Sequence, residues 1–143
     1  MLKQIKGDIL NINRGIILHQ VNCCKVVGGL AGALNRKFPK AFEVYFKDPT
    51  RKESRLGQFL IGKHDGVHIA HIFGQFYPGK NTDMKAVKDS LELLSVYLGV
   101  ALKDDAILYA PFKIGCGLGG GDWSEYEPLL ESIFPQLTIV NNE

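Results

Sequence analysis

The segment GCGLGGGDW, residues 115–123, decides the fold that we expect for the whole chain. Five of its nine residues are glycine, and it ends in an acid and the only tryptophan. The apolar run AILYAP (106–111) precedes it, and a helical pattern, WSEYEPLLESIF (123–134), follows it. Backbone without Cβ atoms can approach an anion closely, and the amino end of a helix adds a partial positive charge. The segment therefore predicts an anion-binding loop between a strand and a helix, with a plain tight turn as the alternative.

Strands and helices alternate along the rest of the chain. GIILHQV (15–21) is mostly apolar and rich in β-branched residues, as is typical of a buried strand, and a second glycine-bearing loop, 22–29, follows it. Asp-Gly between two apolar runs predicts a hairpin of 57–63 and 67–75. Apolar residues at helical spacing predict a long helix over 84–103. The other expected elements are a first strand within 2–9, helices over 30–38 and 39–48, and a last strand over 137–141.

This alternation, with one hairpin in the middle, predicts a single domain over residues 1–143. Its class is α/β, with three layers (α/β/α) around a mixed, mostly parallel central sheet. Ligands of such sheets bind beyond the carboxyl ends of the strands. Both glycine-rich loops, 22–29 and 112–121, follow strands and precede helices, so they are expected at one edge. Two such loops suggest a ligand with more than one phosphate or ribose.

Composition and charge narrow the class of protein. The net charge is +2 on 143 residues, with scattered lysines, so no basic field demands nucleic acid. The N-terminus lacks the apolar core of a signal peptide, and no apolar run is long enough to span a bilayer. Cys23, Cys24 and Cys116 are odd in number and two are adjacent, which favours reduced thiols. We therefore expect a soluble cytoplasmic protein with no membrane partner.

Two known phosphate-binding patterns fit the glycine-rich segment poorly. A Walker A loop needs Gly-Lys-Ser/Thr, which does not follow here. Gly115, Gly117 and Gly120 do fit the dinucleotide pattern G-x-G-x-x-G, but that pattern also needs an acid near the end of the next strand. The chain has Asn141 at that place. A Rossmann-type NAD-binding protein therefore stays a minor alternative.

Four motifs in order resemble the macro domains, a family of ADP-ribose-binding modules, and the resemblance covers nearly the whole chain. It is nearest to the bacterial and phage branch, which holds ADP-ribose 1''-phosphate phosphatases and DNA-ADP-ribose hydrolases. The motifs are KGDIL (6–10), ILHQVNCCKVVGGLAGAL (17–34), IFGQFYPGKNTD (72–83) and IGCGLGGGDW (114–123).

The resemblance implies a domain that binds ADP-ribose, and we expect neither a cofactor nor a metal. It implies hydrolysis of an ADP-ribose derivative, with the 1''-phosphate monoester as first choice. A protein- or nucleic-acid-linked ADP-ribosyl group is the second choice. A non-catalytic reader or scavenger of ADP-ribose is the alternative from another functional class.

The resemblance also implies which residues contact ADP-ribose. Asp8, beside Ile9, matches the aspartate that accepts a hydrogen bond from the adenine amino group. Asn22 matches the asparagine that contacts the distal ribose. Asn141 stands where many members place an aromatic residue against adenine. The remaining implied contacts are Gly28, Gly29, Leu30, Ile114, Gly115, Cys116, Gly117, Leu118 and Gly119.

Several catalytic positions of the family carry other residues here. The first-loop aspartate of many hydrolases is replaced by Ala31, and the aspartate that follows Gly-Cys-Gly-Leu in another branch is replaced by Gly119. The lysine of the DNA-directed branch matches Phe76, with Lys80 nearby. These replacements favour a reader of ADP-ribose over an enzyme.

Three candidate catalytic residues remain: His19, Asn22 and Asp122. His19 stands where phosphatase-type members carry histidine, a residue suited to acid–base or nucleophilic chemistry near neutral pH. The alternative role of His19 is that of a core histidine, and the alternative role of Asp122 is that of a helix N-cap. His64, His68 and His71 invite a metal interpretation, but the last two would point to opposite faces of a strand. No base is expected beside Cys116, and Cys23 and Cys24 are expected to pack.

Overall fold

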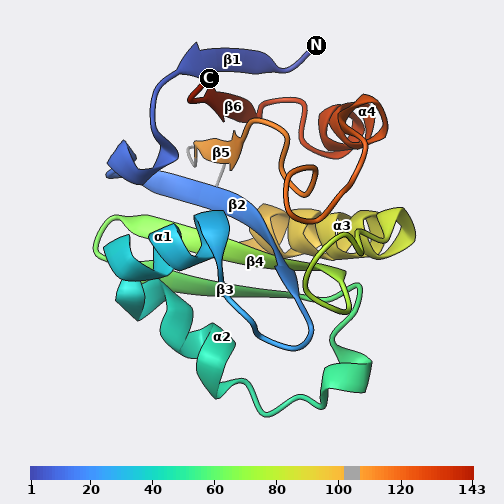
Figure 1. Cartoon of the computed structure of the whole chain (residues 1–143). Coiled ribbons are helices and arrows are strands. Elements are labelled where there is room, and N and C mark those ends of the chain that lie inside the picture. Colours follow the sequence, from blue (N-terminus) through green and yellow to red (C-terminus); the bar gives the residue numbers. More distant parts are fainter. Residues whose placement is uncertain (102–106) are drawn as a thin grey trace.

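The computed structural model describes residues 1–101 and 107–143, and a six-stranded sheet forms its centre. The strands lie in the order β1-β6-β5-β2-β4-β3, and every neighbouring pair is parallel except the hairpin of β3 and β4 (Figure 1). The expectation of a mixed, mostly parallel sheet is therefore confirmed. The strands are β1 (Lys3–Lys6), β2 (Gly15–Asn22), β3 (Phe59–His64), β4 (Val67–Gln75), β5 (Leu108–Pro111) and β6 (Thr138–Asn141).

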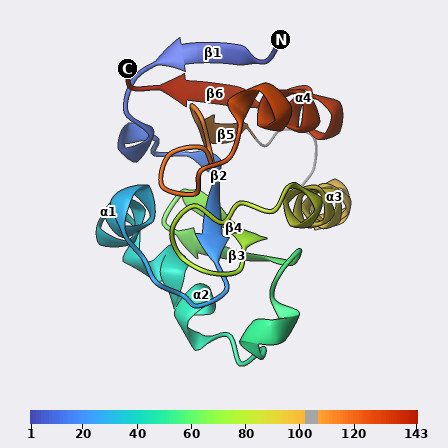
Figure 2. The same cartoon turned by 45° about the vertical axis from the view of Figure 1, so that its right-hand side comes forward.

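Helices cover both faces of the sheet, which gives the expected α/β/α layers. Figures 1 and 2 show α1 and α2 on one side and α3 and α4 on the other. The α-helices are α1 (Gly29–Lys37), α2 (Glu43–Lys47), α3 (Met84–Ala101) and α4 (Trp123–Ile133). Short 3₁₀ helices are η1 (Ile9–Asn11), η2 (Pro39–Phe42) and η3 (Lys52–Ser54).

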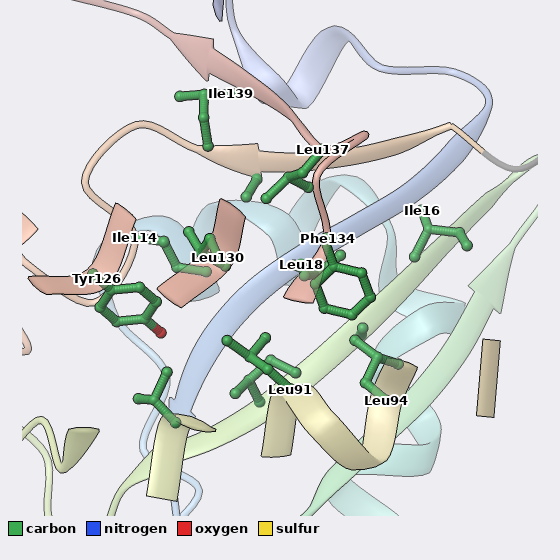
Figure 3. Close-up of a cluster of buried hydrophobic side chains, with 14 of the residues drawn as sticks. Ile16, Leu18, Leu91, Leu94, Ile114, Tyr126, Leu130, Phe134, Leu137 and Ile139 are labelled. Atoms are coloured by element: carbon green, nitrogen blue, oxygen red, sulfur yellow. The ribbon is translucent and has the colours of Figure 1, made fainter. Parts of the chain in front are cut away.

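Side chains alternate along β2 and so divide the core into two clusters. Ile16 and Leu18 join Leu91 and Leu94 of α3 in the cluster under α3 and α4, which Figure 3 shows. Ile17 belongs to the other cluster, under α1 and α2. Both faces of β2 are buried, because the strand lies inside the sheet and is covered on each side. A buried parallel strand reads as a nearly continuous apolar run for this reason.

Element boundaries differ from the predicted ones mainly near proline and glycine. One helix was expected over 39–48, but a 3₁₀ turn at 39–42 precedes a short α-helix. Pro39 has no N–H to donate, and α1 ends just before it. In the hairpin, Asp65 takes a positive φ of 51°, as a tight turn requires. The expected helix end at 102–103 and strand start at 106 lie outside the described residues.

No helix in the described part of the chain combines the length and the hydropathy that crossing a bilayer requires.

Candidate ligand-binding site

A cavity of about 460 Å³ lies at the carboxyl ends of β2 and β5. Its size is that of a typical small-molecule site. The two glycine-rich loops form its walls, so they share one edge of the sheet as expected. Figure 2 shows the loop between β5 and α4 opposite α1. The sequence-predicted residues that line the cavity are His19, Asn22, Gly28, Gly29, Leu30, Ile114, Gly115, Gly117, Leu118 and Gly119.

The second loop presents free backbone donors to the cavity. Within the described residues, the N–H groups of Gly117, Leu118 and Gly119 donate no hydrogen bond. The carbonyl oxygen of Gly117, in the peptide that joins it to Leu118, accepts from the N–H of Gly120 at 3.1 Å. Because N–H and C=O point in opposite directions within one peptide, the N–H of Leu118 points the other way. Successive free amides of this kind form an anion-binding nest.

Glycine is required at two positions of this loop for different reasons. Gly115 has a φ of +71°, and a Cβ there would lie 2.5 Å from Oε1 of Gln20. A Cβ on Gly119 would lie 2.6 Å from the carbonyl oxygen of Gly115. A Cβ on Gly117 would meet nothing within 4 Å. A side chain at 117 would thus enter open space beside the cavity rather than the protein.

The first loop closes on itself and leads into α1. Asn22 donates from Nδ2 to the carbonyl oxygen of Val26 at 2.8 Å and accepts from its N–H at 3.1 Å. Arg55 donates to the carbonyl oxygen of Cys23 at 2.7 Å, which ties the loop to the segment after α2. Gly28 is the N-cap of α1, so the amino end of this nine-residue helix lies at the cavity. Its partial positive charge favours an anion there.

His19 lines the cavity but is only 2% exposed, and its ring is held by a second histidine. Nε2 of His71 bonds to the carbonyl oxygen of Ala41 at 2.9 Å. Since a carbonyl only accepts, this nitrogen carries the hydrogen, and Nδ1 of neutral His71 accepts at 2.7 Å from Nε2 of His19. Nδ1 of His19 is therefore the nitrogen that lacks a hydrogen.

Both imidazoles are held in the neutral form. Burial, and then the neighbouring His71, hold the pKa of His19 well below its usual value. Burial lowers the pKa of His71 to about 4, against a smaller opposing effect of the hydrogen bond to Ala41. Nδ1 of His19 is therefore unprotonated at neutral pH, and the ring does not start as a cationic proton donor.

Other predicted site residues lie away from the cavity lining. Asp8 accepts from the N–H of Leu10 at 2.9 Å and caps η1. Its neighbour Ile9 is buried in the cluster under α1 and α2. Asp122 caps α4 by accepting from the N–H of Ser124 at 2.9 Å, as the N-cap alternative anticipates.

The last strand and the third cysteine are also outside the lining. Asn141 bonds to residues near both termini, accepting from the N–H of Gly7 through its backbone and from the N–H of Glu143 through its side chain. Cys116 donates to the carbonyl oxygen of Ile114. Burial raises the pKa of Cys116 to about 11, and burial likewise raises that of Cys23 to about 11. Both thiols are therefore unreactive at neutral pH.

Two of the three positions at which this chain lacks a catalytic residue of the family lie at the cavity. Ala31 and Gly119 line the cavity, and no Asp or Glu occurs among the described residues that line it. Phe76 packs against the cluster under α1 and α2. Lys80 lies over the glycine-rich loop, because a Cβ on Gly120 would come within 2.7 Å of its Cβ. The one charged residue in the described lining is Lys113.

The histidines do not gather into a group of three potential metal ligands in the described part of the chain. His68 and His71 lie three residues apart on β4 and so face opposite sides of the sheet. His64 accepts from the backbone N–H of Lys40. Among residues 1–101 and 107–143, no group of three potential ligands is close enough to hold an ion.

Four polar residues around the cavity were missed by sequence reasoning. They form a hydrogen-bonded network behind the glycine-rich loop. A glutamine inside each of two apolar strands is the signal that could have found it. The residues are Gln20 of β2, Gln75 of β4, Thr82 before α3 and Tyr126 of α4.

Comparison with known proteins identifies the fold family. No model of a known protein family matches the chain. The macrodomain of Mycobacterium tuberculosis DarG superposes with a TM-score of 0.78 at 25% identity, covering 100% of this chain and 98% of that one. The chain belongs to the macrodomain family. The strand order of this macrodomain also differs from the dinucleotide-binding order 3-2-1-4-5-6, which removes the support for a Rossmann protein.

Two relatives in sequence extend over nearly all of this macrodomain. An uncharacterised 17.5 kDa protein of enterobacteria phage T4 is 32% identical over an alignment 151 residues long. The alignment covers 98% of this chain and 94% of that protein. The DNA ADP-ribosyl glycohydrolase of M. tuberculosis is 29% identical over 148 residues. This macrodomain spans 41% of the length of that enzyme.

Proposed function

We propose that this macrodomain binds ADP-ribose, with the diphosphate against the free N–H groups of Gly117, Leu118 and Gly119. The observation that carries the proposal is this run of amides without hydrogen-bond acceptors, in a loop that lines a cavity whose other wall is the amino end of α1. Two phosphates between these groups would be neutralised by backbone dipoles. The near-neutral charge of the chain fits such a site, since no cluster of cations is needed.

The remaining parts of ADP-ribose have places on either side of the diphosphate. Asn22 and Gly28 line the cavity from the first loop, where the distal ribose would contact them. Pro111 and Phe112 line the cavity from the end of β5, and η1 packs beside β5. The adenine ring would lie toward this side, where Asp8 caps η1 and Asn141 ends the neighbouring strand. This orientation gives Asp8 the adenine amino group as its partner.

We further propose hydrolysis of the bond between ADP-ribose and an attached group. The named activity of the mycobacterial relative favours ADP-ribosylated DNA as the first substrate to test. ADP-ribose 1''-phosphate is the second, favoured by His19 at the cavity. Nδ1 of His19 lacks a hydrogen, so it can take a proton from an attacking water, while the proton the leaving group needs would come from solvent.

A non-catalytic reader of ADP-ribose is the rival function. It is favoured by the described cavity lining, in which there is no carboxylate to move a proton. Both functions need the same binding site and differ only in turnover.

Calorimetry with ADP-ribose, AMP and NAD tests the binding step. We expect ADP-ribose to bind most tightly, and equal or tighter binding of NAD would contradict the proposal. Incubation with an ADP-ribosylated oligonucleotide and with ADP-ribose 1''-phosphate, followed by mass analysis of products, tests the reaction. Binding without any product from either substrate would identify a reader.

The variant His19→Ala tests the role of the histidine. We expect it to keep ADP-ribose binding and to lose turnover by about 10²- to 10⁴-fold, the usual contribution of acid–base catalysis. His68→Ala is the control, because that histidine points to the other face of β4. Loss of binding together with turnover would show that His19 is structural.

A further inference from the structure

A chain of hydrogen bonds with one possible direction leads to the glycine-rich loop. Nε2 of Gln75 donates to the carbonyl oxygens of Tyr77 and Gly79, at 2.8 and 2.9 Å. Because carbonyl oxygens only accept, Oε1 of Gln75 must face a donor, which is Nε2 of Gln20 at 2.8 Å. The same nitrogen of Gln20 donates to Oγ1 of Thr82 at 2.8 Å. The two amide orientations are thus fixed by their partners.

Thr82 connects this chain to the loop at two points. Its Oγ1 accepts from Gln20, so its hydroxyl hydrogen donates to the carbonyl oxygen of Gly115 at 2.9 Å. Its backbone N–H donates to the carbonyl oxygen of Gly119 at 3.0 Å. These two carbonyls flank the N–H groups that line the cavity. One residue therefore holds both ends of the segment that presents the free amides.

The surroundings make this arrangement rigid. Tyr126, which is fully buried, donates from its hydroxyl to Oε1 of Gln20 at 2.8 Å. Gln75 is only 7% exposed. Figure 3 shows Tyr126 beside Ile114 at the edge of the apolar cluster. A satisfied polar network next to a low-dielectric core has one preferred geometry, and a missing member leaves a buried group without a partner.

We propose that Thr82, oriented by Gln20, is the positioning residue of the anion-binding loop, although no phosphate oxygen need touch it. Its hydroxyl and its N–H hold the carbonyls of Gly115 and Gly119, so the amides between them stay directed at the cavity. This inference rests on the proposed binding of ADP-ribose. Backbone amides bind an anion well only when they are held in place before it arrives, because ordering a loop on binding lowers affinity.

An isosteric pair of variants tests the proposal. Thr82→Val keeps the shape and removes the hydroxyl, whereas Thr82→Ser keeps the hydroxyl. We expect Thr82→Val to weaken ADP-ribose binding by about tenfold or more, as expected for loss of a buried hydrogen bond that leaves its partners unpaired. Thr82→Ser should bind within about threefold of wild type, a loss below that of a typical hydrogen bond. In the unligated protein, NMR should show shifted amide signals for residues 117–119 only in the valine variant.

Ser90→Ala is the matched control for lost stability. Ser90 of α3 is fully buried and donates to the carbonyl oxygen of Gln58 at 2.8 Å, a bond of the same kind in another part of the chain. We expect this variant to melt at a lower temperature but to bind ADP-ribose as wild type does. Equal losses of affinity in Ser90→Ala and Thr82→Val would overturn the proposal, since the effect would then follow stability alone.

Two further outcomes separate this inference from the proposed function. If wild type binds ADP-ribose and Thr82→Val binds it equally well, the positioning role is refuted while the function stands. If wild type does not bind ADP-ribose, the function itself fails. Should Thr82→Val not fold, Tyr126→Phe tests the same series of hydrogen bonds, because it removes only the Tyr126 hydroxyl that donates to Gln20. It should weaken binding by a few-fold, as a smaller, indirect loss, and unchanged binding would refute the role.

Discussion

Gly117 offers the sharpest test of where the diphosphate lies. Valine there would add three carbon atoms in a position where a Cβ meets nothing within 4 Å, and the φ of Gly117 is not in the positive region that favours glycine. The folded protein can therefore accept the side chain without strain. The added atoms would occupy the space beside the free amides. Binding should suffer while folding does not.

The expected loss follows from the hydrogen bonds that the side chain would block. Each bond from an amide to a charged phosphate oxygen contributes about 1.5–3 kcal/mol. Excluding the ligand from one or two of the three amides would cost about 2–5 kcal/mol, or roughly 30- to 5,000-fold in the dissociation constant. Calorimetry measures the affinity, and thermal unfolding measures the stability of the same preparations.

Two other glycines supply controls for Gly117→Val. Gly99→Val adds the same side chain at an open position of α3 and should change neither affinity nor fold. Gly119→Val would force a Cβ to within 2.7 Å of the Thr82 hydroxyl, so it should lower both stability and affinity. A folded Gly117→Val protein that binds ADP-ribose as wild type does would refute the placement of the diphosphate.

Two further predictions concern titratable side chains, Asp8 and His71. Asp8→Asn should keep most of the cap on η1 yet weaken ADP-ribose binding by about 1–3 kcal/mol, because a charged acceptor for the adenine amino group is lost; unchanged affinity by calorimetry would show that Asp8 only caps. Burial holds the pKa of His71 at about 4, below its ordinary 6.5. As the pH falls from 6.5 to 4, the unfolded chain therefore binds a proton at this residue that the folded chain does not. This difference lowers the free energy of unfolding by about 3 kcal/mol at pH 4. The melting temperature should therefore fall more steeply between pH 7 and 4 in wild type than in His71→Phe, and parallel curves would contradict this.

Local sequence signals predicted the layers of the fold and the position of the two loops. The apolar runs of β2 and β5 are visible without knowledge of their partners, because burial on both faces leaves few polar residues in a strand. The glycines of 115–121 are equally visible, since a close backbone approach cannot tolerate side chains. Boundaries were less certain at 39–48, where a 3₁₀ turn that begins at Pro39 and the short α2 replace one expected helix.

The candidate catalytic residues were harder to judge, because their roles depend on partners distant in the sequence. His19 meets His71 only through the pairing of β2 with β4, 52 residues apart, and that contact buries it and fixes its tautomer. Gln20 meets Tyr126, 106 residues later, through the packing of α4 on the sheet. Asp122 could be judged locally, because an acid directly before a helix is a common N-cap, and the structure shows it in that role.

The binding loop and its support show why glycine alone does not define such a site. A run of glycines permits many backbone conformations and so loses more entropy on ordering than other residues do. The loop of this macrodomain is held by contacts from outside its own glycines: the Thr82 hydroxyl donates to the carbonyl oxygen of Gly115, and the Thr82 N–H donates to that of Gly119. The network behind Thr82 comes from three other elements, β2, β4 and α4, each fixed by the sheet or the core. Glycine makes a close approach possible, and on our proposal the polar residues around it select the one conformation in which the amides can converge on an anion.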